Sequence, residues 1–119
     1  MKKNFNVPLL DSFGEQAKDD RSGKPLTVAD VAVTALTEPC PGDETLTPVE
    51  KIGLHSLAIR IGESTKPGAP EGGARQFTKE ELVTIKNRAS KNIRILSFGR
   101  LCEIVDSDEA DPKGPAESA

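Results

Sequence analysis

Few side chains in this sequence are of the types that carry out chemistry. His55 is the only histidine, and Cys40 and Cys102 are the only cysteines. A histidine acts as a general base when a nucleophile and an orienting group stand beside it. The sequence places no serine or cysteine nucleophile against His55, so we interpret His55 as a surface or interface residue.

The other candidates for chemistry are no stronger. Cys40 lies in a Pro-Cys-Pro-Gly loop whose neighbouring acids do not activate a thiol, and Cys102 falls on the apolar face of a predicted helix. The Glu-Gly-Gly stretch at 71–73 lacks the strand and helix of a phosphate-binding loop. Four acids do not have the spacing of a calcium loop, namely Asp19, Asp20, Asp43 and Glu44. We therefore expect no enzyme, no metal and no cofactor.

One charge pattern could mark a binding surface. Residues 79–100 carry six bases and two acids, a net charge of +4. A solvated helix face is the interpretation that we prefer, because charged faces are ordinary. The alternative is a basic contact surface for nucleic acid or an acidic partner, formed by Lys86, Arg88, Lys91 and Arg94. The chain has four phenylalanines and no tryptophan or tyrosine, which disfavours a platform for stacking bases.

Length and composition indicate one small cytoplasmic domain. A chain of 119 residues is the size of a single domain. No run of 18 or more apolar residues is present, so we expect no membrane span. The N-terminal residues lack the apolar stretch and cleavage site of a signal peptide, so we expect two reduced thiols in a cytoplasm.

Three segments begin with a capping box, in which a threonine cap is followed three residues later by an acid. The pairs are Thr27 with Asp30, Thr47 with Glu50, and Thr78 with Glu81. They predict helices over 27–38, 47–62 and 78–89. Pro39 and Pro41 end the first helix, Gly62 caps the second, and a polar turn at 90–92 ends the third.

A fourth helix is predicted over 93–105. It places Ile95, Phe98, Cys102 and Val105 on one face, and it is apolar nearly all round, which is typical of a buried helix. A strand over 92–98 is the less favoured alternative, because short apolar runs are ambiguous. We expect the helical pair over 77–105 to be the core of the protein's stability.

The predicted helix over 47–62 has two apolar stripes. The main stripe holds Leu54, Leu57, Ala58 and Ile61. Ile52 and Ile59 lie almost opposite it at 100° per residue, with His55 between the stripes. The second stripe indicates either a central helix packed on both faces or a partner face formed by Ile52, His55 and Ile59. A homodimer is one hypothesis for that partner.

The predicted fold is mainly α (α+β), with three to four short helices, an N-terminal β-hairpin and a disordered acidic tail. Residues 1–105 form the single domain, extended over 1–26 and helical over 27–105, with a mobile loop at 63–75. The tail, 106–119, carries five acids and one lysine, a net charge of −4 compared with −3 for the whole chain. Its composition predicts disorder.

The order of these segments resembles a group of small, mostly uncharacterised proteins of tailed phages and prophages. In that group an LTAEE…IK segment precedes a GR…EIL-like end, and here the matching stretches are FTKEELVTIKNR and FGRLCEIV. The resemblance covers most of residues 2–106 and departs at Asn92-Ile93-Arg94. It implies a phage origin and an accessory role in the cytoplasm of a bacterial host.

We therefore expect a non-enzymatic phage or prophage accessory or regulatory protein that acts by protein–protein interaction. One alternative is a nucleic-acid-binding regulator that uses the basic helix face. The other is a chaperone for assembly of phage tail or head proteins.

Overall fold

The computed structural model describes residues 1–107 and shows a mainly α domain, as predicted. Its four helices are α1 (Val28–Thr37), α2 (Pro48–Glu63), α3 (Lys79–Asn92) and α4 (Ile95–Val105). Two short 3-10 helices, η1 (Asp43–Thr45) and η2 (Pro70–Gly73), lie in the connections. The predicted disordered tail lies outside the described residues from position 108 onward.

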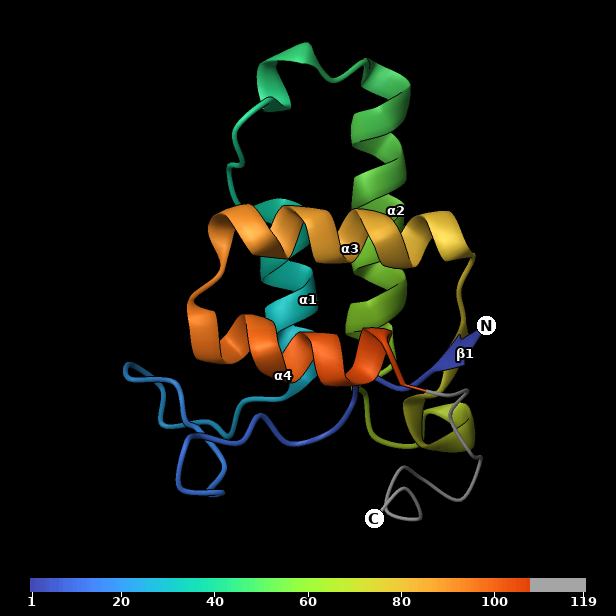
Figure 1. Cartoon of the computed structure of the whole chain (residues 1–119). Helices are drawn as coiled ribbons and strands as arrows, with labels where there is room; N and C mark the ends of the chain where they lie inside the picture. The colour runs from blue at the N-terminus through green and yellow to red at the C-terminus, as the bar shows by residue number, and fades with distance from the viewer. Residues whose placement is uncertain (108–119) are drawn as a thin grey trace.

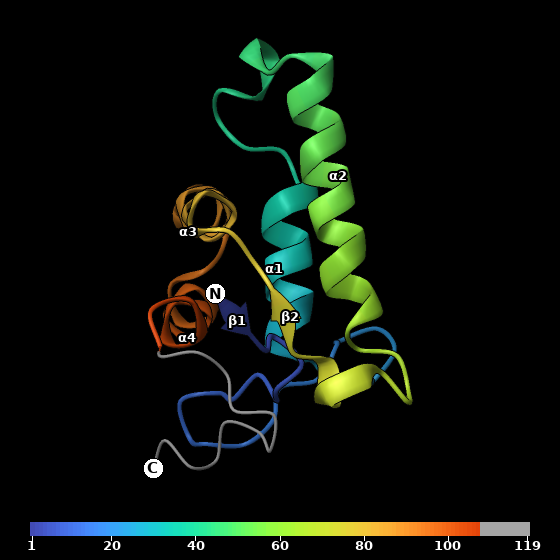
Figure 2. The ribbon, with the colours of Figure 1, turned by 90° about the vertical axis from the view of Figure 1, so that its right-hand side faces the viewer.

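The helices form two crossed layers. In Figure 1, α1 and α2 run vertically and antiparallel to each other, and the antiparallel pair of α3 and α4 runs across them. Figure 2 shows α3 and α4 end-on beside the upright α1 and α2. The first half of α2 rises above α3 and is joined to α1 by the loop that holds η1.

The helix starts follow the sequence signals closely. All three predicted capping boxes are present, with the caps Thr27, Thr47 and Thr78. The helix ends differ from the prediction. Gly62 lies within α2, whose C-terminal cap is Ser64, and α3 continues through the predicted turn to Asn92. Residues 90–92 contain no glycine or proline, so nothing in the backbone forces the helix to stop there.

Short strands tie the N-terminus to the middle of the chain. β1 (Lys2–Lys3) pairs antiparallel with β2 (Arg75–Gln76), with Lys2 opposite Gln76. Residues 8–27 double back in isolated antiparallel bridges, including Pro8 with Thr27. The buried Lys3 ammonium also donates to the carbonyl oxygen of Ser107 after α4, so β1 contacts both ends of the α3–α4 pair.

Helix α1 is at the centre of the hydrophobic core. It lies against α2 and against the α3–α4 layer, which leaves it few exposed positions. The core residues contributed by α1 are Val28, Ala29, Val31, Ala32, Ala35 and Leu36. The predicted core over 77–105 therefore supplies only one layer, and α1 supplies the centre.

The predicted buried face of α4 is wrong in part. Ile95 is 91% exposed and Leu96 45%, whereas Leu101 is 0% and Val105 8% exposed. Only one side of α4 packs on the rest of the domain, and that side is centred near Leu101. The prediction of a wholly buried helix is therefore also wrong. The strand alternative is excluded, because residues 95–98 are helical.

The loop over 63–75 is less exposed than its composition predicted. Residues 65–68 are exposed, but Ser64, Gly73 and Ala74 are buried. Lys2 forms an ion pair with Glu71, with the ammonium nitrogen and carboxylate oxygen 2.8 Å apart. These contacts hold the second half of the loop against β1. The mobility of the loop stays a prediction.

Candidate functional site

The most distinctive surface of the domain is the projecting half of α2. We define the α2 arm as residues 39–54, which are the loop after α1 and the first half of α2. The buried residues of α2 all lie in its second half, at Leu57, Ala58 and Ile61. On the arm, Val49 is 79% and Ile52 64% exposed. The arm therefore presents two apolar side chains, Val49 and Ile52, that no other described element covers.

The exposed apolar residues of α2 lie along one line of the helix. We define the outer stripe as Val49, Ile52 and Ile59, the last of which is 50% exposed. At 100° per residue these three positions fall within about 80° of one another and opposite the buried residues. The alternative of a helix packed on both faces is thereby excluded for these side chains.

The structure thus gathers the three predicted partner-face residues on one exposed side of α2. Ile52 and Ile59 are on the outer stripe, and His55 is exposed beside it. Val49 was missed by the sequence reasoning. Its spacing of three from Ile52 was the available signal, since residues three and four apart share a helix face.

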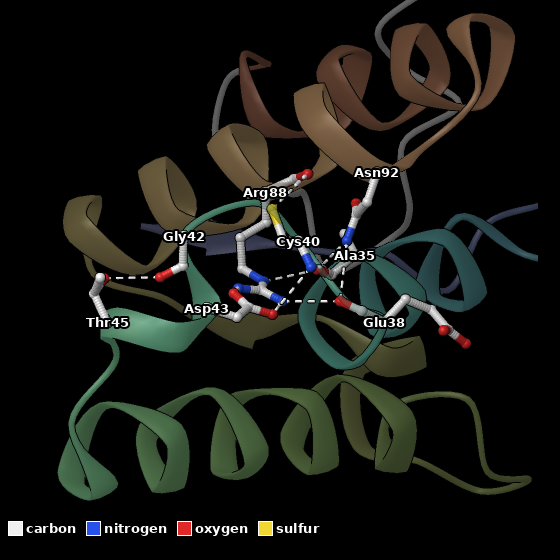
Figure 3. Close-up of polar contacts among 8 residues, drawn as sticks. All are labelled: Ala35, Glu38, Cys40, Gly42, Asp43, Thr45, Arg88 and Asn92. Carbon is white, nitrogen blue, oxygen red and sulfur yellow. Dashed lines mark hydrogen bonds and ion pairs between the residues drawn. The ribbon is translucent and has the colours of Figure 1, made fainter.

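A polar network anchors the base of the arm (Figure 3). The side chain of Arg88, on α3, is only 11% exposed and reaches across to the end of α1. Its Nε donates to the carbonyl oxygen of Ala35 at 2.8 Å, and one terminal nitrogen donates to that of Glu38 at 3.0 Å. The other terminal nitrogen lies 2.6 Å from the carboxylate of Asp43, in the arm.

Two further residues complete this network, which we call the Arg88 clamp. Asn92, one turn after Arg88, donates to the same carbonyl oxygens of Ala35 and Glu38 at 3.1 and 3.3 Å. The backbone N–H of Cys40 donates to Asp43 at 3.0 Å. The last carbonyls of a helix have no partner within the helix, so the clamp satisfies those of α1 and fixes the loop that leads into the arm.

Electrostatics strengthen the clamp. The hydrogen bond from Arg88 lowers the pKa of Asp43 below its ordinary value, and the same contact raises the pKa of Arg88. Both groups therefore stay charged at neutral pH. Because the guanidinium bonds one carboxylate and two backbone oxygens at once, it is a structural cation and is not available to a ligand.

The second half of α2 is held to α3 by a separate contact. Arg60 forms a two-pronged ion pair with Glu81, at 3.0 and 2.8 Å, and lies over the ring of Phe77 at 5.6 Å from its centroid. The hydrogen bond from Arg60 lowers the pKa of Glu81. The Arg88 clamp therefore fixes the start of the arm, and this pair fixes the second half of α2, from which the arm projects.

Two hollows flank the arm at its base. One, of about 470 Å³, opens between α2 and α3, and the other, of about 520 Å³, opens toward the loop with η1. Both are lined by Leu46, Leu54 and Arg88. Hollows of this size that are lined by both apolar and polar residues suit side chains of another chain or a small molecule.

The four predicted basic residues do not form one surface. Arg88 is committed to the clamp, and the ammonium of Lys86 lies 2.9 Å from the carboxylate of Asp106. Lys91 and Arg94 are exposed near the turn between α3 and α4. Of the four predicted residues, therefore, only Lys91 and Arg94 are exposed.

The chemistry-bearing residues stay apart from one another. His55 is exposed, Cys40 is buried, and partial burial raises the pKa of Cys102 above its ordinary value. Residues 1–107 contain no cluster of three or more histidine, cysteine or acidic side chains that could hold a metal ion. Over the same residues, none of the helices combines the length and the apolar character needed to cross a membrane.

Comparison with known proteins gives no relative for this chain. No family model matches it, and no curated protein or solved structure does so either.

Proposed function

We propose that this protein is a non-enzymatic accessory or regulatory protein that acts by binding another protein through the outer stripe of α2. The observation that carries the proposal is the outer stripe, in which Val49, Ile52 and Ile59 are each at least half exposed. Single exposed apolar residues are normal on a protein surface, but an aligned group on a projecting helix is typical of an interaction site.

The way in which the arm is held supports the same proposal. A binding helix that is already rigid loses little conformational freedom when its partner docks. The Arg88 clamp fixes the start of the arm, and the Arg60–Glu81 pair fixes the helix beyond it. The apolar stripe is therefore presented in one orientation.

We place the protein among phage or prophage accessory proteins because of the sequence resemblance over residues 2–106. An assembly chaperone for tail or head proteins would use the same exposed apolar helix face, so it is one form of the proposal. The nucleic-acid alternative has less support, since Arg88 is engaged in the clamp and Lys86 is paired with Asp106.

Substitution on the stripe tests the proposal. Ile52→Glu changes a 64% exposed side chain, so the variant should keep its helical circular dichroism spectrum. Val83→Glu, on α3, is the matched control, because Val83 is 48% exposed and lies away from the arm. Tagged wild-type protein and Val83→Glu should capture a common partner from a phage-infected bacterial lysate, and Ile52→Glu should lose it. Equal capture by all three proteins would refute a role for the stripe.

A further inference from the structure

The hollow between α2 and α3 is a groove with an apolar floor. We call this hollow of about 470 Å³ the α2–α3 groove, and its volume is that of a site for a ligand or a side chain. One wall follows α2 and the other follows α3, where the two helices cross (Figure 1). The floor is made of leucines, namely Leu46, Leu54 and Leu57. None of the outer-stripe residues lines the groove, so it is a separate surface.

The charges that line the groove do not cancel within the protein. Glu81 and Arg88 line it, but each already has an ionic partner, Arg60 for the first and Asp43 for the second. Glu50 lines it too, and within residues 1–107 no lysine or arginine forms an ion pair with Glu50. The α2 wall therefore carries one carboxylate without a cation.

Glu50 is charged at neutral pH and is held in place. It closes the capping box of α2, in which its carboxylate accepts the backbone N–H of Thr47 at 3.0 Å. This hydrogen bond lowers the pKa of Glu50 below its ordinary value. A carboxylate has about four acceptor positions, so Glu50 can still accept donors from another molecule.

A second carboxylate lies beside the α3 wall. Glu80, Thr84 and Asn87 follow one another at intervals of four and three, so they share one face of α3. Glu80 is exposed and forms no ion pair in the part of the chain that the structure describes. The next base along that face is Lys91, which lies one turn beyond Asn87 and does not line the groove. Acids therefore flank the leucine floor on both sides.

We propose that the α2–α3 groove binds an arginine side chain of another protein. Long basic side chains pack their methylene groups on apolar surface and keep the charged end at the rim, which suits leucines edged by Glu50 and Glu80. The guanidinium is planar and weakly hydrated and carries five N–H donors, whereas the ammonium of lysine is strongly hydrated and fits such a site less well. This inference goes beyond the proposed function, because it does not involve the outer stripe.

Titration with short peptides, followed in the backbone amide NMR spectrum, tests the inference. The probe is acetyl-Ala-Arg-Ala-amide, and its control carries citrulline, in which a neutral urea of the same shape replaces the guanidinium. The arginine peptide should shift the amide signals of Gly53, Thr84 and Asn87, all of which line the groove, and saturate with a Kd of about 1–10 mM. The citrulline peptide should bind at least about twofold more weakly.

Substitutions test the two carboxylates. Glu50→Gln and Glu80→Gln should each weaken binding of the arginine peptide about two- to fivefold, which is the effect of one exposed ion pair. Glutamine also closes a capping box, so Glu50→Gln should keep the fold. Glu63→Gln is the matched control and should bind like the wild type, because Glu63 is an exposed acid of α2 that does not line the groove.

Three results would overturn the inference. Equal binding of the arginine and citrulline peptides would remove the role of charge, and equal effects of Glu50→Gln and Glu63→Gln would remove the role of the groove. Propylguanidinium, the arginine side chain without a peptide, should bind no more tightly than the arginine peptide. Tighter binding would mean that the groove takes a free small cation and not a side chain of a protein.

The same titration separates this inference from the proposed function. Ile52→Glu should leave binding of the arginine peptide unchanged, while Glu50→Gln should weaken it. Loss of peptide binding in Ile52→Glu would show that the groove is not a separate site and would overturn the inference. If the arginine peptide does not bind at all while Ile52→Glu still loses its captured partner, the inference fails and the proposed function stands.

Discussion

Gly73 is the position where one added methyl group should harm the fold most. Its backbone has a φ of +103°, which L side chains rarely adopt. A Cβ atom there would lie 2.6 Å from the backbone oxygen of Ser64 and 2.9 Å from the Cβ of Asn6. Neither atom is the end of a flexible side chain, so the end of η2 would have to move away from both the C-terminal cap of α2 and the N-terminal segment.

The expected cost of Gly73→Ala has two parts. Forcing a residue with a Cβ atom into a left-handed conformation costs about 1–2 kcal/mol. Overpacking against a fixed neighbour costs about 1–3 kcal/mol more. The total of about 2–5 kcal/mol is a large share of the 5–15 kcal/mol that typically stabilises a domain. At roughly 4–8 °C per kcal/mol, the melting temperature should fall by at least about 8 °C.

Gly72→Ala is the matched control. Gly72 also has a positive φ, +67°, but an added Cβ would meet nothing within 4 Å. It should therefore lose only the conformational part, about 1–2 kcal/mol. Urea unfolding followed by circular dichroism measures both free energies of unfolding. Equal losses for the two variants would show that the close approach to Ser64 does not constrain the fold, and the reasoning would fail.

Three further predictions follow from burial and charge. Ile61→Ala should lower the free energy of unfolding by about 2–5 kcal/mol because Ile61 is 0% exposed, while Ile52→Ala should lower it by less than about 1 kcal/mol because Ile52 is 64% exposed. Urea midpoints that rank the two variants in the opposite order would contradict the packing of α2. Phe98→Ala should cost about 1.5–3 kcal/mol, below the 3–5 kcal/mol of a fully buried phenylalanine, because Phe98 is half-buried at the edge of the core, and the same melts measure it. Asp43 and Glu81 have lowered pKa values in the folded protein, so the stability from their ion pairs is present above about pH 4 and is lost as the pH falls through the folded pKa values. Between pH 7 and pH 3, the urea midpoint should therefore fall less steeply for Arg88→Met, which lacks the pair with Asp43, than for the wild type. An equal slope for the two proteins would refute the contribution of the clamp.

The sequence predicts what depends on local chemistry. A capping box is made by residues three positions apart, so the starts of α1, α2 and α3 could be found from Thr27, Thr47 and Thr78. The buried face of α4 could not be found in this way. Apolar residues lie all round that helix, so periodicity favours no side, and only the packing of Leu101 against the other helices decides it.

In the candidate site, too, some features follow from the local sequence and others depend on tertiary packing. The outer stripe is visible in the sequence as Ile52 and Ile59, but whether it is exposed depends on where α1, α3 and α4 lie. Arg88 is the opposite case. In sequence it belongs to a run of bases, whereas its partner Asp43 is 45 positions away and no local pattern joins them. A run of basic residues in the sequence does not show which of them already form ion pairs within the fold.

The composition of the Arg88 clamp has a consequence for how freely this region can vary. Ala35 and Glu38 contribute only backbone carbonyl oxygens to it, and these are present whatever side chains those positions carry. Mutational tolerance should therefore be uneven around the clamp. Glu38 is exposed and can be replaced without loss of any clamp contact, while Arg88 and Asp43 cannot, since each acts through its side chain. A saturation mutagenesis library scored for folded protein would accept most residues at 38 and few at 43 and 88, which gives a sequence rule for recognising the same arm in chains too divergent to align.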